Sequence, residues 1–319
     1  MPLLHSSYKA PFYLFNKHLQ TIVPSELRRI KQIHYHRERI STPDHDFLDI
    51  DWLFATQKAT QAVIVSHGLE GDTQRPYMKG MARALTIAGY DVATWNYRSC
   101  SGEMNLTRRL YHGGVTDDLE TVIRHVIQKG YTSIHLVGFS LGANITLKYL
   151  GEKKYTSLAS IGKAVVFSVP CDLKGSSQQL SSTLYKHIFL RDFRRKIKSK
   201  ALQMPEHIST AGLKNMRFIA DFDERYTAPL HGFASADDYY EKCSSRQFIP
   251  TISTPTLIIN AQNDPFLSKG CFPIEEAQKY DTIYLEMPTG GGHCGFSNLY
   301  FNKQYWSEWR AIAFFQQYL

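Results

Sequence analysis

The sequence predicts an α/β fold, in which a mostly parallel central sheet is flanked by helices and carries a mainly helical insertion. Strand-like and helix-like runs alternate over residues 61–170 and again over 251–319. The run at 62–65 is short and wholly apolar, which is typical of a strand buried on both faces of a parallel sheet. Residues 171–250 interrupt this alternation with helical, basic and aromatic sequence.

The elements before the interruption follow in order. Residues 1–60 are an N-terminal extension that ends in strands at 33–40 and 47–54, with turn-forming residues between them. The elements expected next are a strand at 62–65, a helix at 77–87, a strand at 91–96, a helix at 115–129, a strand at 131–137, a helix at 143–150 and a strand at 163–169.

The interruption after Pro170 divides the chain into parts. It follows the sixth main strand, and the core resumes with strands at 256–261 and 282–287 and a helix from about 304 to the end. The expected units are the N-terminal extension with the first strands (1–60), the first part of the core (61–170), the helical insertion (171–250) and the last part of the core (251–319).

Size and composition restrict the class of protein. The 319 residues are 43% hydrophobic and 21% charged, which is enough for one large core and argues against disorder. No apolar run approaches the roughly 18 to 20 residues that a membrane span needs. Residues 1–10 lack a basic region followed by an apolar core, so we expect no secretory signal and a cytoplasmic location.

The cysteines and histidines do not indicate a disulfide framework or a metal site. The five cysteines are an odd number with no C-x-x-C spacing, so reduced thiols are expected. His34 and His36 could face one side of a strand, but the sequence offers no nearby third ligand. A surface strand is therefore expected there, and no metal is.

The formal charge of +8 is partly concentrated in residues 191–200. Such a run usually forms the solvated face of a helix. Transient contact with an anionic membrane surface or an acidic substrate is the alternative. Nucleic acid is not an expected partner, because no aromatic-rich basic module accompanies the run.

The pattern Gly138-Phe139-Ser140-Leu141-Gly142 lies between a strand-like and a helix-like run. G-x-S-x-G at such a junction is the nucleophile elbow of serine hydrolases, where a sharp turn exposes the serine hydroxyl above the sheet. The small residues on either side of the serine let strand and helix approach closely. An ordinary tight turn could carry the same five residues, so the other members of a site must be found.

A nucleophilic serine needs a base and an acid that orients it, and in this chain order the acid precedes the histidine. His293 lies in a glycine-rich loop just after the last strand, and Asp264 directly follows the strand at 256–261. Asp172, after the preceding strand, is the rival acid, but its position matches the order less well. We therefore predict Ser140, Asp264 and His293 as the catalytic residues.

An oxyanion formed at the serine would need backbone N–H donors. The Leu141 N–H, at the start of the helix after the elbow, is the first candidate. The second is the Leu69 N–H, in the glycine-containing loop 66–71 that follows the strand at 62–65. His67 in that loop is expected to shape it, because the site already has its histidine.

Several motifs together resemble the YheT-like branch of the α/β-hydrolase superfamily, the AB hydrolase 4 group. This branch includes ABHD-type acylglycerol lipases and phospholipases and yeast medium-chain ester synthases. The motifs span nearly the whole chain in the family's order. They are His18–Ile22, His67–Gly71, Asn96–Gly102, Gly138–Ala143, Thr227–Phe233, Asn263–Phe266 and Gly292–Phe296.

The resemblance implies a serine carboxylesterase or lipase that acts on carboxylic esters of short to medium acyl length without a cofactor. It assigns Ser140 as nucleophile, Asp264 as acid and His293 as base, and the insertion as a lid. The membrane-bound relatives carry an N-terminal anchor that this sequence lacks, so it looks like the soluble bacterial type. An alcohol acyltransferase or thioesterase with the same triad, a non-catalytic ligand-binding member of the fold, and a peripheral membrane protein remain alternatives.

Overall fold

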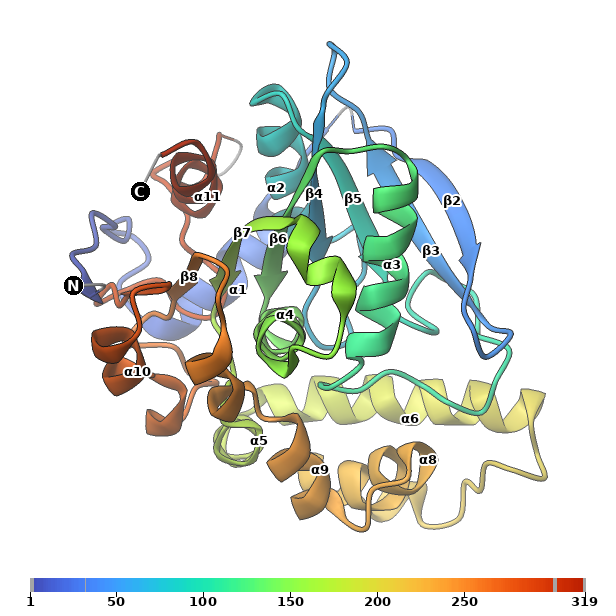
Figure 1. The fold of residues 1–319 in the computed structure, drawn as a ribbon. Coiled ribbons are helices and arrows are strands. Elements are labelled where there is room, and N and C mark those ends of the chain that lie inside the picture. The colour runs from blue at the N-terminus through green and yellow to red at the C-terminus, as the bar shows by residue number, and fades with distance from the viewer. Residues whose placement is uncertain (1–2, 32, 301–302, 318–319) are drawn as a thin grey trace.

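The computed structural model describes residues 3–31, 33–300 and 303–317 and centres on a nine-stranded sheet of order β1-β9-β8-β7-β6-β4-β5-β3-β2 (Figure 1). Neighbouring strands are parallel except where β3 pairs with β2 and with β5. This confirms the predicted fold class. The strands are β1 (Leu3–Leu4), β2 (His36–Ser41), β3 (Phe47–Leu53), β4 (Gln61–Ser66), β5 (Asp91–Asn96), β6 (Ser133–Phe139), β7 (Ile161–Phe167), β8 (Thr256–Ile259) and β9 (Ile283–Glu286).

Helices cover both faces of the sheet and bury a core on each. One core packs α3, α4 and α10 against the strands, and the other packs α2 and α11, with α1 beside α2. Strands β4 and β5 are buried along nearly their whole length, as expected for strands covered on both sides. These helices are α1 (Lys17–Leu27), α2 (Pro76–Ile87), α3 (Thr116–Gln128), α4 (Leu141–Glu152), α10 (Ile274–Lys279) and α11 (Trp306–Gln316).

Most of the expected elements occur within a few residues of their predicted bounds, but the N-terminal extension was incompletely predicted. The expectation did not include β1, at the edge beside β9, or the eleven-residue helix α1. Asn16 caps α1 by accepting hydrogen bonds from the N–H groups of His18 and Leu19. The C-terminal helix ends at Gln316, and residues 318–319 lie outside the described residues.

The insertion between β7 and β8 forms a helical layer beneath the carboxyl ends of the parallel strands (Figure 1). β7 is the sixth strand counted from β2. Phe193 and Phe222 stack in the core of this layer, with ring centroids 4.2 Å apart. The main helices are α5 (Leu173–Ser181), α6 (Tyr185–Gln203), α7 (Ile219–Phe222), α8 (Ala228–His231) and α9 (Ala236–Cys243).

The basic run 191–200 lies in α6, and the expectation of a uniformly solvated face is wrong for two of its lysines. Lys200 is fully buried and donates to the carbonyl oxygen of Asn105 at 2.6 Å. Lys196 is also largely buried, whereas Arg191 and Arg195 are exposed. Two of the cations therefore bind the insertion to the core.

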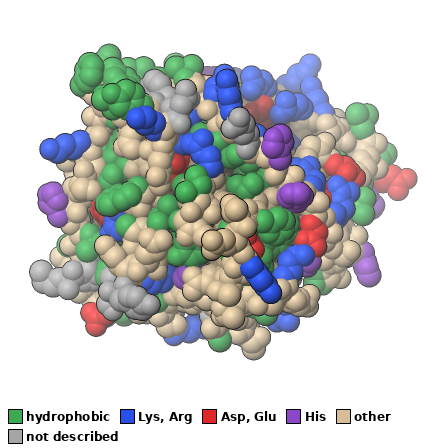
Figure 2. Space-filling view, turned by 90° about the horizontal axis from the view of Figure 1, so that it is seen from above, with side chains coloured by type: hydrophobic (Ala, Val, Ile, Leu, Met, Phe, Trp, Pro, Cys, Tyr) green, Lys and Arg blue, Asp and Glu red, His purple; other side chains and the backbone are tan. Residues whose placement is uncertain are grey.

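On the face of the molecule opposite α6, positive charge is not gathered into one patch. Figure 2 shows the end of the molecule away from α6, where lysine and arginine side chains are scattered among apolar and uncharged ones. No helix within the described ranges is both long enough and apolar enough to cross a membrane.

Candidate active site

Ser140 occupies the sharp turn between β6 and α4. Its φ of 52° lies in the left-handed region, which costs energy for a residue with a side chain. A Cβ at Gly138 would lie 2.7 Å from the Cα of Ala143, and a Cβ at Gly142 would lie 2.5 Å from the carbonyl oxygen of Ser66. Glycine is therefore required at both positions for strand and helix to approach closely.

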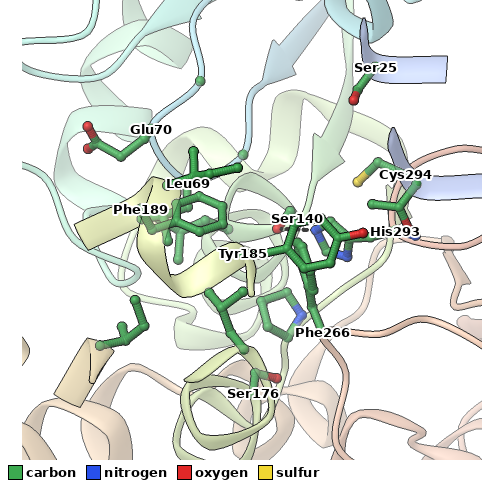
Figure 3. Close-up of a pocket in the computed structure, with 18 of the residues that line it drawn as sticks. Ser25, Leu69, Glu70, Ser140, Ser176, Tyr185, Phe189, Phe266, His293 and Cys294 are labelled. Carbon is green, nitrogen blue, oxygen red and sulfur yellow. Dashed lines mark hydrogen bonds between the residues drawn. The ribbon is translucent and has the colours of Figure 1, made fainter. Parts of the chain in front are cut away.

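His293 bridges Ser140 and Asp264, and the three residues come from segments far apart in the chain. Figure 3 shows His293 beside Ser140. The Ser140 Oγ is 2.8 Å from His293 Nε2. On the other side of the ring, Nδ1 is 2.9 Å from Asp264 Oδ2 and 3.1 Å from Oδ1. The geometry allows the hydroxyl to donate to the imidazole while the imidazole donates to the carboxylate.

The carboxylate of Asp264 sets the electrostatics of the imidazole. The Asp264 side chain is completely buried, and its Oδ1 also accepts from the Phe266 N–H at 2.8 Å. Burial of His293 opposes its protonation, but the adjacent negative charge more than offsets this and raises the pKa of His293. The arrangement therefore stabilises an imidazolium at this position.

Four consecutive backbone N–H groups, from Gly291 to Cys294, hold the histidine loop in place. They donate to side chains from three other parts of the fold, so the ring position does not depend on the loop alone. The acceptors are Gln20 for Gly291 (2.7 Å), Asn263 for Gly292 (3.1 Å), Thr21 for His293 (3.0 Å) and Ser168 for Cys294 (2.9 Å).

The prediction from sequence did not include these supporting residues. Gln20 and Thr21 belong to α1, the helix absent from the expected elements, and Ser168 directly follows β7. The segments His18–Ile22 and Asn263–Phe266 are among the motifs that resemble the family. That resemblance was the only signal in the sequence that pointed to any of these supporting residues. It marked these segments without indicating that they bind the histidine loop.

Asp172 does not approach the imidazole in this structure. It is the N-cap of α5, where its Oδ1 accepts from the Gly175 N–H at 3.0 Å and its Oδ2 accepts from the Ser268 hydroxyl at 2.7 Å. The structure therefore brings Asp264, and not Asp172, to His293.

The loop after β4 packs directly against the serine. A Cβ at Gly68 would lie 3.1 Å from the Cβ of Ser140. The N–H groups on either side of Leu69 donate to phenol oxygens, at 3.0 Å for Gly68 and 2.8 Å for Glu70. Within the described residues, neither the Leu69 N–H nor the Leu141 N–H donates to a protein acceptor. Both groups remain available to a ligand beside the serine.

His67 is fully buried in the same loop. Its Nδ1 lies 2.7 Å from the Gly68 carbonyl oxygen, and its Nε2 accepts from the Tyr97 N–H at 3.3 Å. Burial lowers the pKa of His67 to about 3, so the ring is neutral. Both ring nitrogens serve the local backbone, which fits a role in shaping the loop.

A cavity of about 410 Å³ opens beside Ser140 and His293. Figure 3 shows Leu69, Tyr185, Phe189 and Phe266 around the serine. Most of the wall is apolar, and the insertion contributes more of the lining residues than either α1 or the segment after β4. Lining residues from the insertion include Leu173, Leu180, Ile188, Phe189, Phe193 and Ile219.

Comparison with known proteins agrees with this architecture. Residues 61–296 match the family model described as the alpha/beta hydrolase fold. The chain is 34% identical over 313 residues to the putative esterase YheT of Escherichia coli strain K12, covering 95% of this chain and 91% of that protein. It is 26% identical over 308 residues to phospholipase ABHD3 of Mus musculus, covering 92% and 74%.

A solved structure gives the same result for the fold. The Pyrococcus furiosus esterase Pf2001, in its P212121 crystal form, matches with a TM-score of 0.58. The match covers 91% of this chain and 95% of that one at 15% sequence identity. At this identity the likeness shows a shared fold.

Proposed function

The chain belongs to the YheT-like branch of the α/β-hydrolase fold family, and on this premise we propose a serine carboxylesterase whose nucleophile, base and orienting acid are Ser140, His293 and Asp264. The observation that carries the proposal is the pair of short contacts, 2.8 Å from Ser140 to His293 and 2.9 Å from His293 to Asp264, at the wall of an apolar cavity. A hydroxyl, a base and a buried carboxylate in this order are what acyl transfer requires.

The first half of the reaction forms an acyl-enzyme. His293 Nε2 takes the proton from Ser140 as Oγ attacks the ester carbonyl, and Asp264 stabilises the imidazolium that results. The imidazolium then gives its proton to the departing alcohol oxygen as the carbon–oxygen bond breaks. Asp264 raises the pKa of His293, which favours the earlier step, in which the imidazole takes the proton from Ser140.

The second half releases the acid. Water enters where the alcohol left, gives a proton to His293 and attacks the acyl carbon, after which Ser140 regains its proton. In both halves the carbonyl oxygen becomes negatively charged. We propose the N–H groups of Leu69 and Leu141 as its donors, because both residues line the cavity beside the serine and neither N–H has an acceptor among the residues that the structure describes.

The substrate that fits this cavity is an ester of short to medium acyl length. A largely apolar volume of about 410 Å³ is the size of a small-ligand pocket and favours a hydrocarbon chain over a charged one. We propose that the insertion acts as a lid that sets the accepted length, since it supplies the largest share of the lining residues. The mouse relative is named a phospholipase, which supports a lipid-derived ester.

The exposed guanidinium groups of Arg191 and Arg195 support a further part of the proposal, transient contact of α6 with an anionic membrane surface. A cytoplasmic location is also proposed. The five cysteines carry free thiols in the structure, as expected in a reducing compartment.

The decisive experiment combines hydrolysis with active-site labelling. We expect the wild type to hydrolyse p-nitrophenyl butyrate and to react with a fluorophosphonate probe at Ser140. Ser140→Ala should lose both, with the hydrolytic rate falling by about 10⁴- to 10⁶-fold, while its circular dichroism spectrum is unchanged. Turnover retained by Ser140→Ala would assign the nucleophile elsewhere, and a wild type that neither labels nor hydrolyses would favour a non-catalytic ligand-binding protein.

A further inference from the structure

An ion pair joins the insertion to the loop that carries Leu69. Lys196 of α6 donates to Glu70 Oε1 at 2.6 Å, and the two side chains are only 10% and 8% exposed. The ammonium also lies 4.6 Å from the centroid of the Tyr111 ring. Burial alone would lower the pKa of Lys196, but its contacts with Cys100 and Glu70 raise it, so the lysine is charged at neutral pH.

Glu70 is held in an unusual conformation. Its φ of 51° lies in the left-handed region, which is costly for a residue other than glycine and must be maintained by its surroundings. The hydroxyl of Tyr111 accepts from the Glu70 N–H at 2.8 Å and donates to its carboxylate at 2.5 Å. The carbonyl oxygen of Glu70 accepts from Arg75 at 3.3 Å.

Stability is a poor explanation for this pair. Two buried charges lose hydration that their mutual attraction roughly repays, and apolar residues of similar volume would stabilise the contact as well or better. A charged pair does, however, fix one geometry. Here the fixed residue is the immediate neighbour of Leu69, the proposed oxyanion donor. The loop packs so closely on the serine that a Cβ at Gly68 would lie 3.1 Å from the Cβ of Ser140.

We infer that Lys196 and Glu70 are positioning residues for the reaction: their ion pair fixes the backbone at Leu69, so the oxyanion donor is in place only while α6 is docked. This inference rests on the proposed function. It makes the insertion part of the catalytic apparatus as well as a wall of the cavity. The oxyanion donor and the acyl pocket are then assembled by the same contact.

The test compares methionine substitutions along one helix. Lys196→Met should lower kcat for p-nitrophenyl butyrate by about 10- to 100-fold and change KM less than twofold. This is a smaller fall than the roughly 10²- to 10³-fold fall in kcat expected when one oxyanion donor is removed altogether. Glu70→Gln should have an effect of similar size. The double variant should be no worse than the poorer single variant, because both substitutions break one interaction.

Two lysines of α6 serve as controls. Lys200→Met removes a buried ammonium that contacts Asn105 and not the Leu69 loop, so it should lower Tm and leave kcat unchanged. Lys198→Met removes an exposed charge and should change neither. Equal losses of kcat in Lys196→Met and Lys200→Met would show general loosening of the insertion and overturn the inference.

A tetrahedral inhibitor separates positioning from packing. The inhibition constant of a trifluoromethyl ketone should rise in Glu70→Gln by the same factor as kcat/KM falls, because both report on the oxyanion. An unchanged inhibition constant in Glu70→Gln would overturn the inference. If Lys196→Met folds poorly, Glu70→Gln still tests it. A wild type without hydrolysis would refute the proposed function itself. An active wild type with normal kcat in both Lys196→Met and Glu70→Gln would refute the inference alone.

Discussion

The sheet end that carries Ser140 and His293 and the insertion that covers it are held by different means. At the sheet end, backbone geometry fixes the side chains: a serine with positive φ, glycines that admit no Cβ, and four consecutive amides bound by side chains of other elements. The insertion is held by side-chain contacts, such as the stacked Phe193 and Phe222 and the buried ammonium of Lys200.

Apart from the contact between Lys196 and Glu70, we expect this difference to separate the proposed chemistry from the choice of substrate. Backbone-held groups are sensitive to small displacements, since an error of about 1 Å at a reacting group can cost about 100-fold in rate. Side chains that line an apolar wall can change while the fold persists, provided that volume is roughly conserved. Substitutions at the sheet end should therefore change kcat, and substitutions in the insertion wall should change which esters are accepted.

After loss of the serine itself, the largest effect is expected from Asp264→Asn. Loss of the carboxylate removes the group that orients the imidazole and stabilises its protonated form, so kcat should fall by about 10⁴-fold. In the proposed mechanism the neutral form of His293 is the base, so activity should be lost as pH falls through the pKa of His293. Because Asp264 raises that pKa, its removal should move the acidic limb of the kcat/KM profile to lower pH.

Asp172→Asn is the matched control for this substitution, because it removes the other carboxylate that follows a neighbouring strand. Its partners in the structure are Gly175 and Ser268. We expect near-normal kcat and an unshifted pH profile, with at most a modest fall in Tm from the weakened helix cap. A 10⁴-fold loss in Asp172→Asn with retained activity in Asp264→Asn would reverse the assignment of the acid.

A smaller effect at the sheet end should follow from Thr21→Val. Thr21 Oγ1 accepts a hydrogen bond from the backbone N–H of His293 at 3.0 Å. Valine has the same shape but offers no acceptor. An unpaired partly buried amide costs about 1–3 kcal/mol, and relaxation of the loop to satisfy it would displace the ring. We expect kcat/KM for p-nitrophenyl butyrate to fall about tenfold. Thr21→Ser keeps the acceptor and should retain most activity, so equal losses in both variants would contradict this role.

The same contrast explains what the sequence could predict. The elbow, the histidine loop and Asp264 follow strands in a fixed order, so local pattern and chain order were enough to select them. Helix α1 has weak signals of its own, with Pro24 inside it and no acidic residue in its first turn, and its importance lies in contacts with a loop some 270 residues away. Lys196 belongs to a run whose charge pattern favours solvent, and only the packing of α6 on the Leu69 loop reveals its partner.

The mildest effect, and the one specific to the insertion, is expected from Phe189→Ala. Phe189 lines the cavity beside Phe266, with ring centroids 6.3 Å apart, so its truncation should lengthen the space available to an acyl chain. Burial of one methylene contributes about 0.8 kcal/mol, or about fourfold in kcat/KM for each carbon newly accommodated.

The measurement is kcat/KM for p-nitrophenyl acetate, butyrate, hexanoate and octanoate. The control is Phe218→Ala, because Phe218 is a half-exposed phenylalanine of the same insertion that lies outside the cavity wall. Phe189→Ala should shift the optimum towards longer chains while Phe218→Ala keeps the wild-type profile. Identical profiles in the two variants would mean that the insertion covers the site without selecting its substrate.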